Sequence, residues 1–494
     1  MKLRHAKVLV VTALLGAAPA KAVVPGFAGN VTGGGNATPV VVSTLSAAQS
    51  AVNGYSGSGG LVLHYNGTFD EAPILANICG QWSKPAQELS ISSKNDITVL
   101  GLDGSSANFG IRIKGSSGNI IVRNMKIGLL PGGASNGDLI GIEANAHHVW
   151  IDHNELYTRN INCPGTPDDD TTFDGLLDIK NSASFITVSY NYIHDHAKVG
   201  LIGASDTDSA ERRVTYAHNR YDNVGSRLPF QRFGYVHVYN NYYNNITGSG
   251  INPRMGGHVL VENNYFENAL NPVFSQSSIL GQWDLRNNNA RSSTDNARFN
   301  IRWTACSGST PCQKATDWTT TATFPIALPY TYTTYSPDVS RCIALNAAGS
   351  GKGLKEAAAV LNVCGGSPAN NVYQTENGTV GGGTVFESTN AGFNGTGYVN
   401  ASTTGGFSQI NNIDGRGGGS KTLRIRYALG VAAARTGRLV VNGVGTNITF
   451  NSTGAWTTWA LQDVSVTLNN TSSNTIRFES TGQDLANIDQ VEIL

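Results

Sequence analysis

The residues best suited to chemistry are aspartates, lysines and arginines between positions 138 and 232. Asp174 and Asp178 are four residues apart around a glycine, and Asp138 precedes a separate predicted strand. Carboxylates gathered without His or Cys favour a hard, oxygen-binding cation, above all Ca²⁺. Standing alone, the D-x-x-x-D spacing is weak evidence, because an ordinary solvated turn has the same pattern.

Fixed positive charges occur in the same stretch of the chain. Lys198 precedes the segment Arg227-Leu-Pro-Phe-Gln-Arg232, which places two arginines five residues apart just before a predicted strand. An arginine fork binds a carboxylate through two parallel hydrogen bonds. The segment therefore indicates a site for an acidic polymer, although each arginine could instead pair with a local acid.

The overall composition excludes a general surface for polyanions. The 34 Lys and Arg residues equal the 34 Asp and Glu residues, and only 14% of the chain is charged. Attraction to nucleic acid or to an anionic membrane is not supported, so recognition of an acidic ligand must be local. The 58 glycines are typical of a turn-rich β protein.

The N-terminus has the pattern of a secretory signal peptide over residues 1–22. A basic start between Lys2 and Lys7 is followed by an apolar run, and Ala20-Lys-Ala22 is an A-x-A cleavage site. The apolar run is too short to span a bilayer, and no other stretch is long enough. We expect a secreted, extracellular protein without a membrane anchor. No feature of the sequence signals an oligomer, so a monomer is expected.

Six cysteines in an exported protein predict disulfides. Their spacing pairs most naturally as Cys306 with Cys312 and Cys342 with Cys364, which leaves Cys79 with Cys163. None lies in a C-x-x-C arrangement, so a zinc site is not expected.

One motif recurs between about residues 97 and 290: an alternating apolar strand that runs into Asn and then an aromatic or aliphatic residue. The repeated residues are Asn124, Asn154, Asn191, Asn219, Asn241 and Asn264, with a weaker copy ending at Asn288. Strand-only repeats of roughly 20–25 residues are typical of a parallel β-helix. Each Asn amide can bond to the Asn one rung away, and Asn tolerates the αL backbone of a tight bend. We interpret these asparagines as structural.

The spacing of the repeat indicates where a site would be built. Successive asparagines are 30, 37 and 28 residues apart up to Asn219, and 22, 23 and 24 apart afterwards. Insertions in a repeat protein form loops that usually build the binding face. Asp138, Asp174, Asp178 and Lys198 all fall within the longer early repeats.

A second unit follows the repeats. The pattern fades after residue 300, and residues 365–372 have the Gly, Ser, Pro and Asn content of a linker. Residues 373–494 contain alternating strands with Gly-rich turns, which is typical of an antiparallel β-sandwich. The expected fold is all-β, with a parallel β-helix over residues 23–364 and a smaller β-sandwich after it.

Several motifs identify a family. They are Asn77-Ile-Cys-Gly-Gln-Trp-Ser83, Val149-Trp-Ile-Asp-His153, Asp174-x-x-x-Asp178-Ile-Lys180, Lys198-Val-Gly-Leu and the highly specific Arg227-Leu-Pro-x-x-Arg232. With them, the chain from roughly residue 30 to residue 364 resembles the bacterial pectate lyases of polysaccharide lyase family 1. That resemblance implies a right-handed parallel β-helix. It also implies Ca²⁺-dependent β-elimination of α-1,4-polygalacturonate to 4,5-unsaturated oligogalacturonides.

The resemblance implies a set of metal ligands. Asp138, Asp174 and Asp178 match the Ca²⁺ ligands of the family. Some relatives carry a further Asp where this chain has Asn136, and some have Glu in place of Asp174. The first difference bears on the number of bound ions rather than on the chemistry.

The resemblance also implies roles for the basic residues. Arg227 matches the arginine that removes the C5 proton of a galacturonate unit. Lys198 and Arg232 match residues that hold the substrate carboxylates, and Lys180 is expected to assist. A guanidinium must lose a proton before it can accept one, so an alkaline pH optimum is expected.

Three other functions compete with this one. Pectin lyases act on methylated polymer without Ca²⁺, which the three retained aspartates argue against. Polygalacturonases hydrolyse with paired Asp residues, and no Asp-Asp plus Gly-His-Gly set is present. A non-catalytic polysaccharide-binding β-helix would not need Arg227 together with three acids, although fold alone never fixes function.

The C-terminal unit resembles a family 35 carbohydrate-binding module, with family 6 close behind. The resemblance rests on segments such as Tyr373-Gln-Thr-Glu376, Trp456-Thr-Thr-Trp459 and Asn487-Ile-Asp489. It implies attachment to plant cell-wall polysaccharide, with a possible structural Ca²⁺. The expected residues are Glu376, Glu387 and Asp489 for Ca²⁺, and Tyr398, Arg435, Trp459 and Asn487 for sugar.

Overall fold

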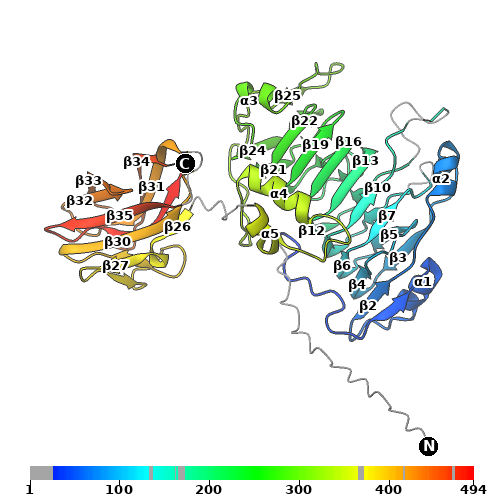
Figure 1. Cartoon of the computed structure of the whole chain (residues 1–494), viewed down its shortest axis with the longest axis horizontal. Coiled ribbons are helices and arrows are strands. Elements are labelled where there is room, and N and C mark those ends of the chain that lie inside the picture. The colour runs from blue at the N-terminus through cyan, green and yellow to red at the C-terminus, as the bar shows by residue number, and fades with distance from the viewer. Residues whose placement is uncertain are drawn as a thin grey trace, which may run out of the picture.

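The structure is a computed structural model that describes residues 26–132, 137–161, 163–164, 173–364, 372–415, 418–469 and 473–494 (Figure 1). The predicted signal peptide and Asn136 lie outside these ranges. The predicted linker also lies outside them, except for Val372, which begins a strand. The chain is all-β apart from short helices, with a parallel β-helix first and antiparallel sheets at the C-terminus, as the sequence predicts.

Each complete turn of the β-helix adds one strand to each of three parallel sheets. Sheet A contains β1 (Val40–Val42), β2 (Leu61–Tyr65), β4 (Asn95–Gly101), β6 (Gly118–Arg123), β9 (His147–Asp152), β12 (Ser184–Ser189), β15 (Arg213–Ala217), β18 (Tyr235–Tyr239), β21 (His258–Glu262) and β24 (Gln282–Arg286). Sheet B contains β3 (Glu88–Ser92), β5 (Gly110–Lys114), β8 (Ile140–Ile142), β11 (Leu177–Ile179), β14 (Leu201–Ile202), β17 (Phe230–Arg232) and β20 (Asn252–Arg254). Sheet C contains β7 (Lys126–Gly128), β10 (Glu155–Tyr157), β13 (Tyr192–Lys198), β16 (Arg220–Ser226), β19 (Tyr242–Ile246) and β22 (Tyr265–Ala269).

The interior of the coil is filled by aligned apolar side chains. In sheet B, Ile113, Ile142, Ile179 and Ile202 pair in register and are all fully buried. Because side chains alternate across a strand, the residues before and after each isoleucine must point outward. Burial of this column therefore fixes which residues of sheet B can form a surface site.

A ladder of buried asparagines joins the rungs where sheet A turns into sheet C. The side-chain amide of each asparagine donates to the side-chain oxygen of the next, at 2.9–3.1 Å, in the order Asn154, Asn191, Asn219, Asn241, Asn264 and Asn288. The same amides also satisfy carbonyl groups of the strands that they leave, such as Tyr216 and Tyr239 for Asn241. The asparagines are thus structural, as expected.

Two details of the sequence interpretation are wrong. Asn124 is not part of the ladder, which begins at Asn154. The Asn154 side-chain oxygen accepts from the Met125 N–H at 2.9 Å, so Met125, and not Asn124, occupies the ladder position of its rung. The αL backbone also falls one residue earlier than expected, on residues such as His218 and Asn240. A ladder side chain must point inward while the bend turns outward, so neighbouring residues divide the two roles.

The C-terminal part of this domain folds back over sheet A. Asn240 donates to the Thr333 carbonyl at 2.8 Å and accepts from the Tyr335 N–H at 3.0 Å, while Asn263 donates to the Tyr335 carbonyl. The helices are α1 (Leu45–Gly54), α2 (Ala72–Ala76), α3 (Ser293–Arg298), α4 (Pro337–Ala347) and α5 (Ala357–Cys364), with a 3₁₀ turn at Cys79–Gln81. No helix in the described part of the chain is long and apolar enough to cross a bilayer.

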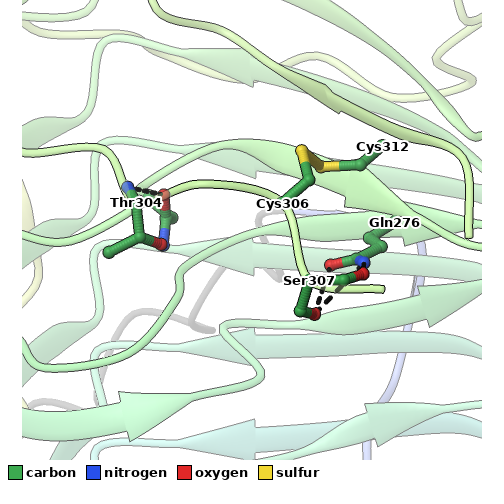
Figure 2. Close-up of a disulfide and its surroundings, with 6 residues drawn as sticks. Gln276, Thr304, Cys306, Ser307 and Cys312 are labelled. Atoms are coloured by element: carbon green, nitrogen blue, oxygen red, sulfur yellow. Dashed lines mark hydrogen bonds between the residues drawn. A yellow bond between two sulfur atoms is a disulfide. The ribbon is translucent and has the colours of Figure 1, made fainter. Parts of the chain in front are cut away.

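Three disulfides join the pairs that the spacing favoured. They are Cys79–Cys163, Cys306–Cys312 and Cys342–Cys364. Figure 2 shows the second, which closes the loop leading into β25 (Cys312–Lys314), the antiparallel partner of β23 (Phe274–Gln276). Gln276 on β23 also donates to the Ser307 carbonyl within that loop.

The C-terminal unit consists of two antiparallel sheets around its own apolar core, which contains Leu423, Phe450 and Phe478. One sheet contains β26 (Val372–Gln374), β28 (Val385–Glu387), β29 (Tyr398–Asn400), β31 (Gly419–Ala428), β34 (Ala460–Leu468) and β36 (Asn487–Ile493). The other contains β27 (Thr379–Gly381), β30 (Thr404–Ile413), β32 (Arg435–Val441), β33 (Val444–Phe450) and β35 (Asn474–Thr481), and a 3₁₀ turn covers Thr375–Asn377.

Replacing Asn241 with Leu should destabilise the β-helix strongly. The change removes the acceptor of the Asn219 N–H and the donor to the carbonyls of Tyr216 and Tyr239, all of them buried. Each unsatisfied buried group costs about 1–3 kcal/mol, so we expect a loss of about 3 kcal/mol or more in denaturant unfolding. Asn66→Ala, on an exposed asparagine, is the control. Equal stability of the two variants would contradict the structural role of the ladder.

Candidate active site

The predicted site residues gather at the bends that lead into sheet B. Backbone hydrogen bonds stack these bends rung on rung: Leu139 N–H donates to the Gly175 carbonyl, Leu176 to Val199, and Val199 to Ser226. Asp138, Asp174, Lys198 and Arg227 adjoin these stacked residues, although long stretches of sequence separate them. The structure therefore brings together the residues that the sequence marked as acidic and basic.

Asp138 is the most enclosed member of the group. Its carboxylate is nearly inaccessible to solvent, and one oxygen, Oδ2, contacts the Lys180 amine at 2.7 Å and the Arg112 guanidinium at 3.3 Å. Its other oxygen, Oδ1, is buried without a hydrogen-bond partner. Lys180 also contacts the Asp178 Oδ2 atom at 3.3 Å. The aspartates are thus tied together through one lysine.

The partnerless oxygen of Asp138 lies close to Gly175, as does one oxygen of Asp178. A methyl group added at Gly175 would lie 2.9 Å from Asp138 Oδ1 and 3.0 Å from Asp178 Oδ1. The two carboxylate oxygens therefore both lie close to Gly175, and Asp178 Oδ1 also accepts from the Leu201 N–H at 3.0 Å. Converging carboxylate oxygens suit a hard cation such as Ca²⁺. Among the described residues, no three His, Cys, Asp or Glu side chains are already arranged as a metal cage, so a bound ion would need further ligands.

Burial and mutual repulsion disfavour the charged forms of two aspartates in the cluster. Burial and the neighbouring Asp178 carboxylate raise the pKa of Asp138 well above its usual value, and the same two causes raise the pKa of Asp174. Burial acts to lower the pKa of Lys180, but Asp178 and Asp138 raise it. An additional cation beside these carboxylates would stabilise their charged forms.

Arg227 lies beside this cluster with its guanidinium uncommitted. It follows β16 in a bend with an αL backbone (φ 68°), and its carbonyl accepts from the Gly200 N–H. Its side chain makes no ion pair or hydrogen bond within the described part of the chain and lies 5.7 Å from the Phe230 ring centre. It is close enough to Asp174 to stabilise that carboxylate's charged form. An arginine held near acids but paired with none is suited to act on a ligand.

Lys198 lies one rung before Arg227, and Arg232 ends the strand that follows Arg227 in the same turn. Lys198 ends β13 and pairs in register with Ser226, next to Arg227. Arg232 ends β17, where its Nε donates to Asp206 at 2.7 Å and its Nη1 to the Gly203 carbonyl at 2.9 Å. Asp206 is itself half exposed, so this ion pair is open to exchange with an acidic ligand.

Arg254 is a basic residue that the sequence analysis missed. It pairs in register with Arg232, and both guanidinium groups lie 4.6 Å from the Phe230 ring centre. Burial and then Arg232 lower the pKa of Arg254, and its Nε is buried without a partner. The feature that could have identified Arg254 is the strand register, because Arg254 occupies the same position in its repeat that Arg232 occupies in the repeat before. The three arginines around Phe230 form a positive surface beside the aspartate cluster.

In the C-terminal unit the predicted metal ligands separate into two groups. Glu376 accepts from the Thr396 N–H at 2.8 Å through one oxygen, and its other oxygen is buried without a partner. The same loop contacts Asp489, which accepts from the Asn394 N–H at 3.1 Å. Glu387 instead accepts from the Tyr398 hydroxyl at 3.2 Å.

Gln374 is the residue that sequence reasoning missed at this place. Its buried Oε1 also lacks a partner, and an added methyl at Gly395 would lie 2.3 Å from the Glu376 carboxylate and 3.0 Å from Gln374 Oε1. Asp489 additionally forms an ion pair with Arg426. The described geometry therefore favours Gln374 and Glu376 over Glu387 as neighbours of a cation.

Burial removes two of the four predicted sugar contacts. Tyr398 is completely buried, with its ring centre 5.3 Å from that of Trp459, and Asn487 is nearly completely buried. Trp459 is partly exposed, with its indole N–H donating to the Ala391 carbonyl at 3.1 Å. Arg435 forms an ion pair with Asp484 at 2.5 Å. Trp459 and Arg435 are the two of the four that a sugar could reach.

Comparison with known proteins covers most of the β-helix. Residues 2–353 match the model of a family described as pectate lyase. Pectate lyase 1 of Pectobacterium carotovorum is 48% identical over 322 residues, which are 64% of this chain and 84% of that protein.

Solved structures give the same result. A pectate lyase C variant in complex with pentagalacturonic acid is 42% identical, with a TM-score of 0.64, over 67% of this chain and 97% of that one. Pectate lyase C from Erwinia chrysanthemi, solved at pH 9.5 with 30 mM Ca²⁺, is 42% identical, with a TM-score of 0.62, over 66% and 96% of the two chains.

The C-terminal region has a match of its own. A family 35 carbohydrate-binding module from Clostridium thermocellum is 34% identical over 25% of this chain and 95% of that one, with a TM-score of 0.24. The assignment of the catalytic region does not depend on this match, because the family model alone covers more than half of the chain. This chain belongs to the pectate lyase family.

Proposed function

We propose that this protein cleaves α-1,4-polygalacturonate by Ca²⁺-dependent β-elimination, with Arg227 as the base. The observation that carries the proposal is the uncommitted Arg227 guanidinium beside two converging, buried carboxylate oxygens. The relatives add weight, since one was solved with pentagalacturonic acid and another with Ca²⁺. Pectate is acidic along its whole length, which suits the arginines around Phe230.

Asp138 and Asp178, with Asp174, would hold the calcium ion. A Ca²⁺ ion held by these residues would supply positive charge close to a galacturonate carboxylate, which would make the C5 proton of that sugar more acidic. The fit rests on the partnerless Asp138 Oδ1 and on the close approach of Asp138 Oδ1 and Asp178 Oδ1 beside Gly175. Lys180 holds the other oxygens of Asp138 and Asp178, so it orients both acids for this role.

The protein's own residues then supply the remaining steps. Arg227, in its neutral form, takes the proton from C5. The electron pair of the broken C5–H bond forms a C4–C5 double bond. The C4–oxygen bond breaks with its electron pair going to the oxygen, which takes a proton from solvent and leaves as one half of the polymer. Lys198 and Arg232 hold neighbouring carboxylates and stabilise the negative charge that develops on the sugar. Because the base must be neutral, the rate should rise from neutral to alkaline pH.

Two alternatives have less support. A pectin lyase acting on methylated polymer would not need the buried aspartates or the arginines around Phe230. A non-catalytic binding protein would gain nothing from leaving the Arg227 guanidinium without an ion pair within the described residues. Neither alternative is favoured by a specific contact.

The C-terminal unit would hold the enzyme on insoluble plant cell wall. Its support is the partly exposed Trp459, whose ring can stack on a sugar. Gln374 and Glu376, each with a buried oxygen that lacks a hydrogen-bond partner, suit a structural cation. Export by the predicted signal peptide and action outside the cell belong to the same proposal, since the three disulfides suit an oxidising compartment.

Arg227→Lys should abolish most lyase activity. A lysine keeps the charge but cannot place a base at the guanidinium position, and general bases contribute about 10²–10⁴-fold to rates. The measurement is kcat on polygalacturonate with saturating Ca²⁺. Arg213→Lys, on sheet A, is the matched control and should retain full activity. Full activity of the Arg227 variant would contradict its assignment as the base.

Removal of Asp178 should weaken calcium binding directly. Asp178→Asn deletes one of the converging charges, so we expect roughly tenfold or greater loss of Ca²⁺ affinity, because affinity depends on the number of charged ligands. Calorimetric titration and the Ca²⁺-induced rise in Tm both report this without relying on turnover. Asp284→Asn, on sheet A, should bind Ca²⁺ like the unmodified protein. An unchanged titration for Asp178→Asn would remove the site from this cluster.

Deleting residues 373–494 should weaken adsorption to insoluble cell wall and leave turnover of soluble polygalacturonate unchanged. The two units have separate apolar cores, so the β-helix should remain folded. Adsorption is measured by depletion from the supernatant and turnover on soluble polymer. Equal losses in both measurements would refute independent units.

A further inference from the structure

One straight row of outward residues crosses sheet B at right angles to its strands. Ile113, Ile142, Ile179, Ile202 and Gln231 pair in register and are buried. The residues that follow them therefore stand side by side on the outer face. In order along the coil they are Lys114, Glu143, Lys180, Gly203 and Arg232, with Arg254 paired to Arg232. The row is cationic except for one glutamate and one glycine.

The row extends beyond the proposed catalytic residues at its N-terminal end. Successive rungs are about 4.8 Å apart, so Lys114 is two rungs, about 10 Å, from Lys180. Between and around them is a hollow of about 620 Å³, lined by Glu88, Arg112, Lys114, Glu143 and Lys180 among others. Lys180 is shared by this hollow and the aspartate cluster, so the two are continuous.

The charges within the hollow are not equally available. Arg112 is committed, because its guanidinium lies 3.0 Å from Glu88 and 3.3 Å from Asp138. Gly141 on β8 pairs with Arg112 and has no side chain that would block the Arg112 guanidinium from reaching Asp138. Lys180 is likewise held by two aspartates. Lys114 is partly exposed and forms no ion pair with any residue that the structure describes.

We propose that Lys114 anchors a distal subsite for one carboxylate of the pectate chain. We propose also that Glu143, on the rung between Lys114 and Lys180, disfavours a free carboxylate on the sugar above it. Glu143 lies 3.7 Å from Arg112 and is about one-fifth exposed, so its charge faces the groove only partly neutralised. A galacturonate over Glu143 is accepted best when it is methyl-esterified and uncharged, whereas the sugar over Lys114 is accepted best as a free acid. The inference rests on the proposed function, since it extends the same groove.

The test compares oligogalacturonates of increasing length. Lys114→Gln should leave kcat/KM unchanged on short oligomers and lower it about tenfold above a threshold length, as expected for loss of one charge-assisted contact. Glu143→Gln should act in the opposite direction, raising kcat/KM on long, fully de-esterified chains more than on methyl-esterified ones. Lys352→Gln removes the same charge from an exposed lysine outside sheet B and should change nothing.

The outcomes separate this inference from the proposed function. Equal effects of Lys114→Gln at every length, or no effect at any length, would overturn the distal subsite while leaving the lyase assignment intact. Migration in gels that contain polygalacturonate measures binding without turnover. Retardation that depends on Lys114 in a protein without lyase activity would support the subsite and contradict the proposed chemistry.

Discussion

Strict register between successive rungs is the constraint on which every other feature depends. Isoleucines at one position per turn are buried in sheet B, and the asparagine ladder holds the turns in step from Asn154 to Asn288. A shift of one residue would turn the outer row inward and place Lys180 and Arg232 in an apolar core. The rigid coil therefore positions charges that the chain contributes from distant repeats.

The site itself is governed by charge balance. Asp138 and Asp178 turn one oxygen each toward the space over Gly175, and their other oxygens are held by Lys180. Lys180 and Arg112 offset part of the repulsion between these neighbouring acids, and the proposed Ca²⁺ ion would offset it further. Farther along the coil the local charge is positive instead of negative, because Arg227, Arg232 and Arg254 have few acids near them. A polyanion laid along sheet B would pair with these arginines, and a cation would be needed between its carboxylates and the aspartates.

Much of this arrangement could be predicted from the sequence, because each sequence repeat forms one turn of the β-helix. The ladder asparagines and the aspartates at insertion-bearing turns were predicted. Asn124 was assigned wrongly because the motif of Asn before an apolar residue occurs at both the bend and the ladder position. Arg254 could not be selected without the pairing of β17 with β20, which sequence spacing alone does not give.

The C-terminal unit was harder to predict for a different reason. In a small sandwich the same aromatic residue types serve the core and the binding face, and only burial separates them. Tyr398 and Trp459 read alike in the sequence, yet one is enclosed and hydrogen-bonded to Glu387 while the other reaches the surface. Gln374 was missed because an amide oxygen carries no charge to mark it as a ligand.

The most direct test of the central claim is the ultraviolet absorbance of the unsaturated product. It is followed on de-esterified and on highly methyl-esterified polymer, with Ca²⁺ and with a chelator. The account predicts a steady rise in absorbance on the de-esterified polymer with Ca²⁺, and none once the ion is removed. Absorbance that rises equally with chelator present, or only on the methylated polymer, would contradict a calcium-dependent pectate lyase.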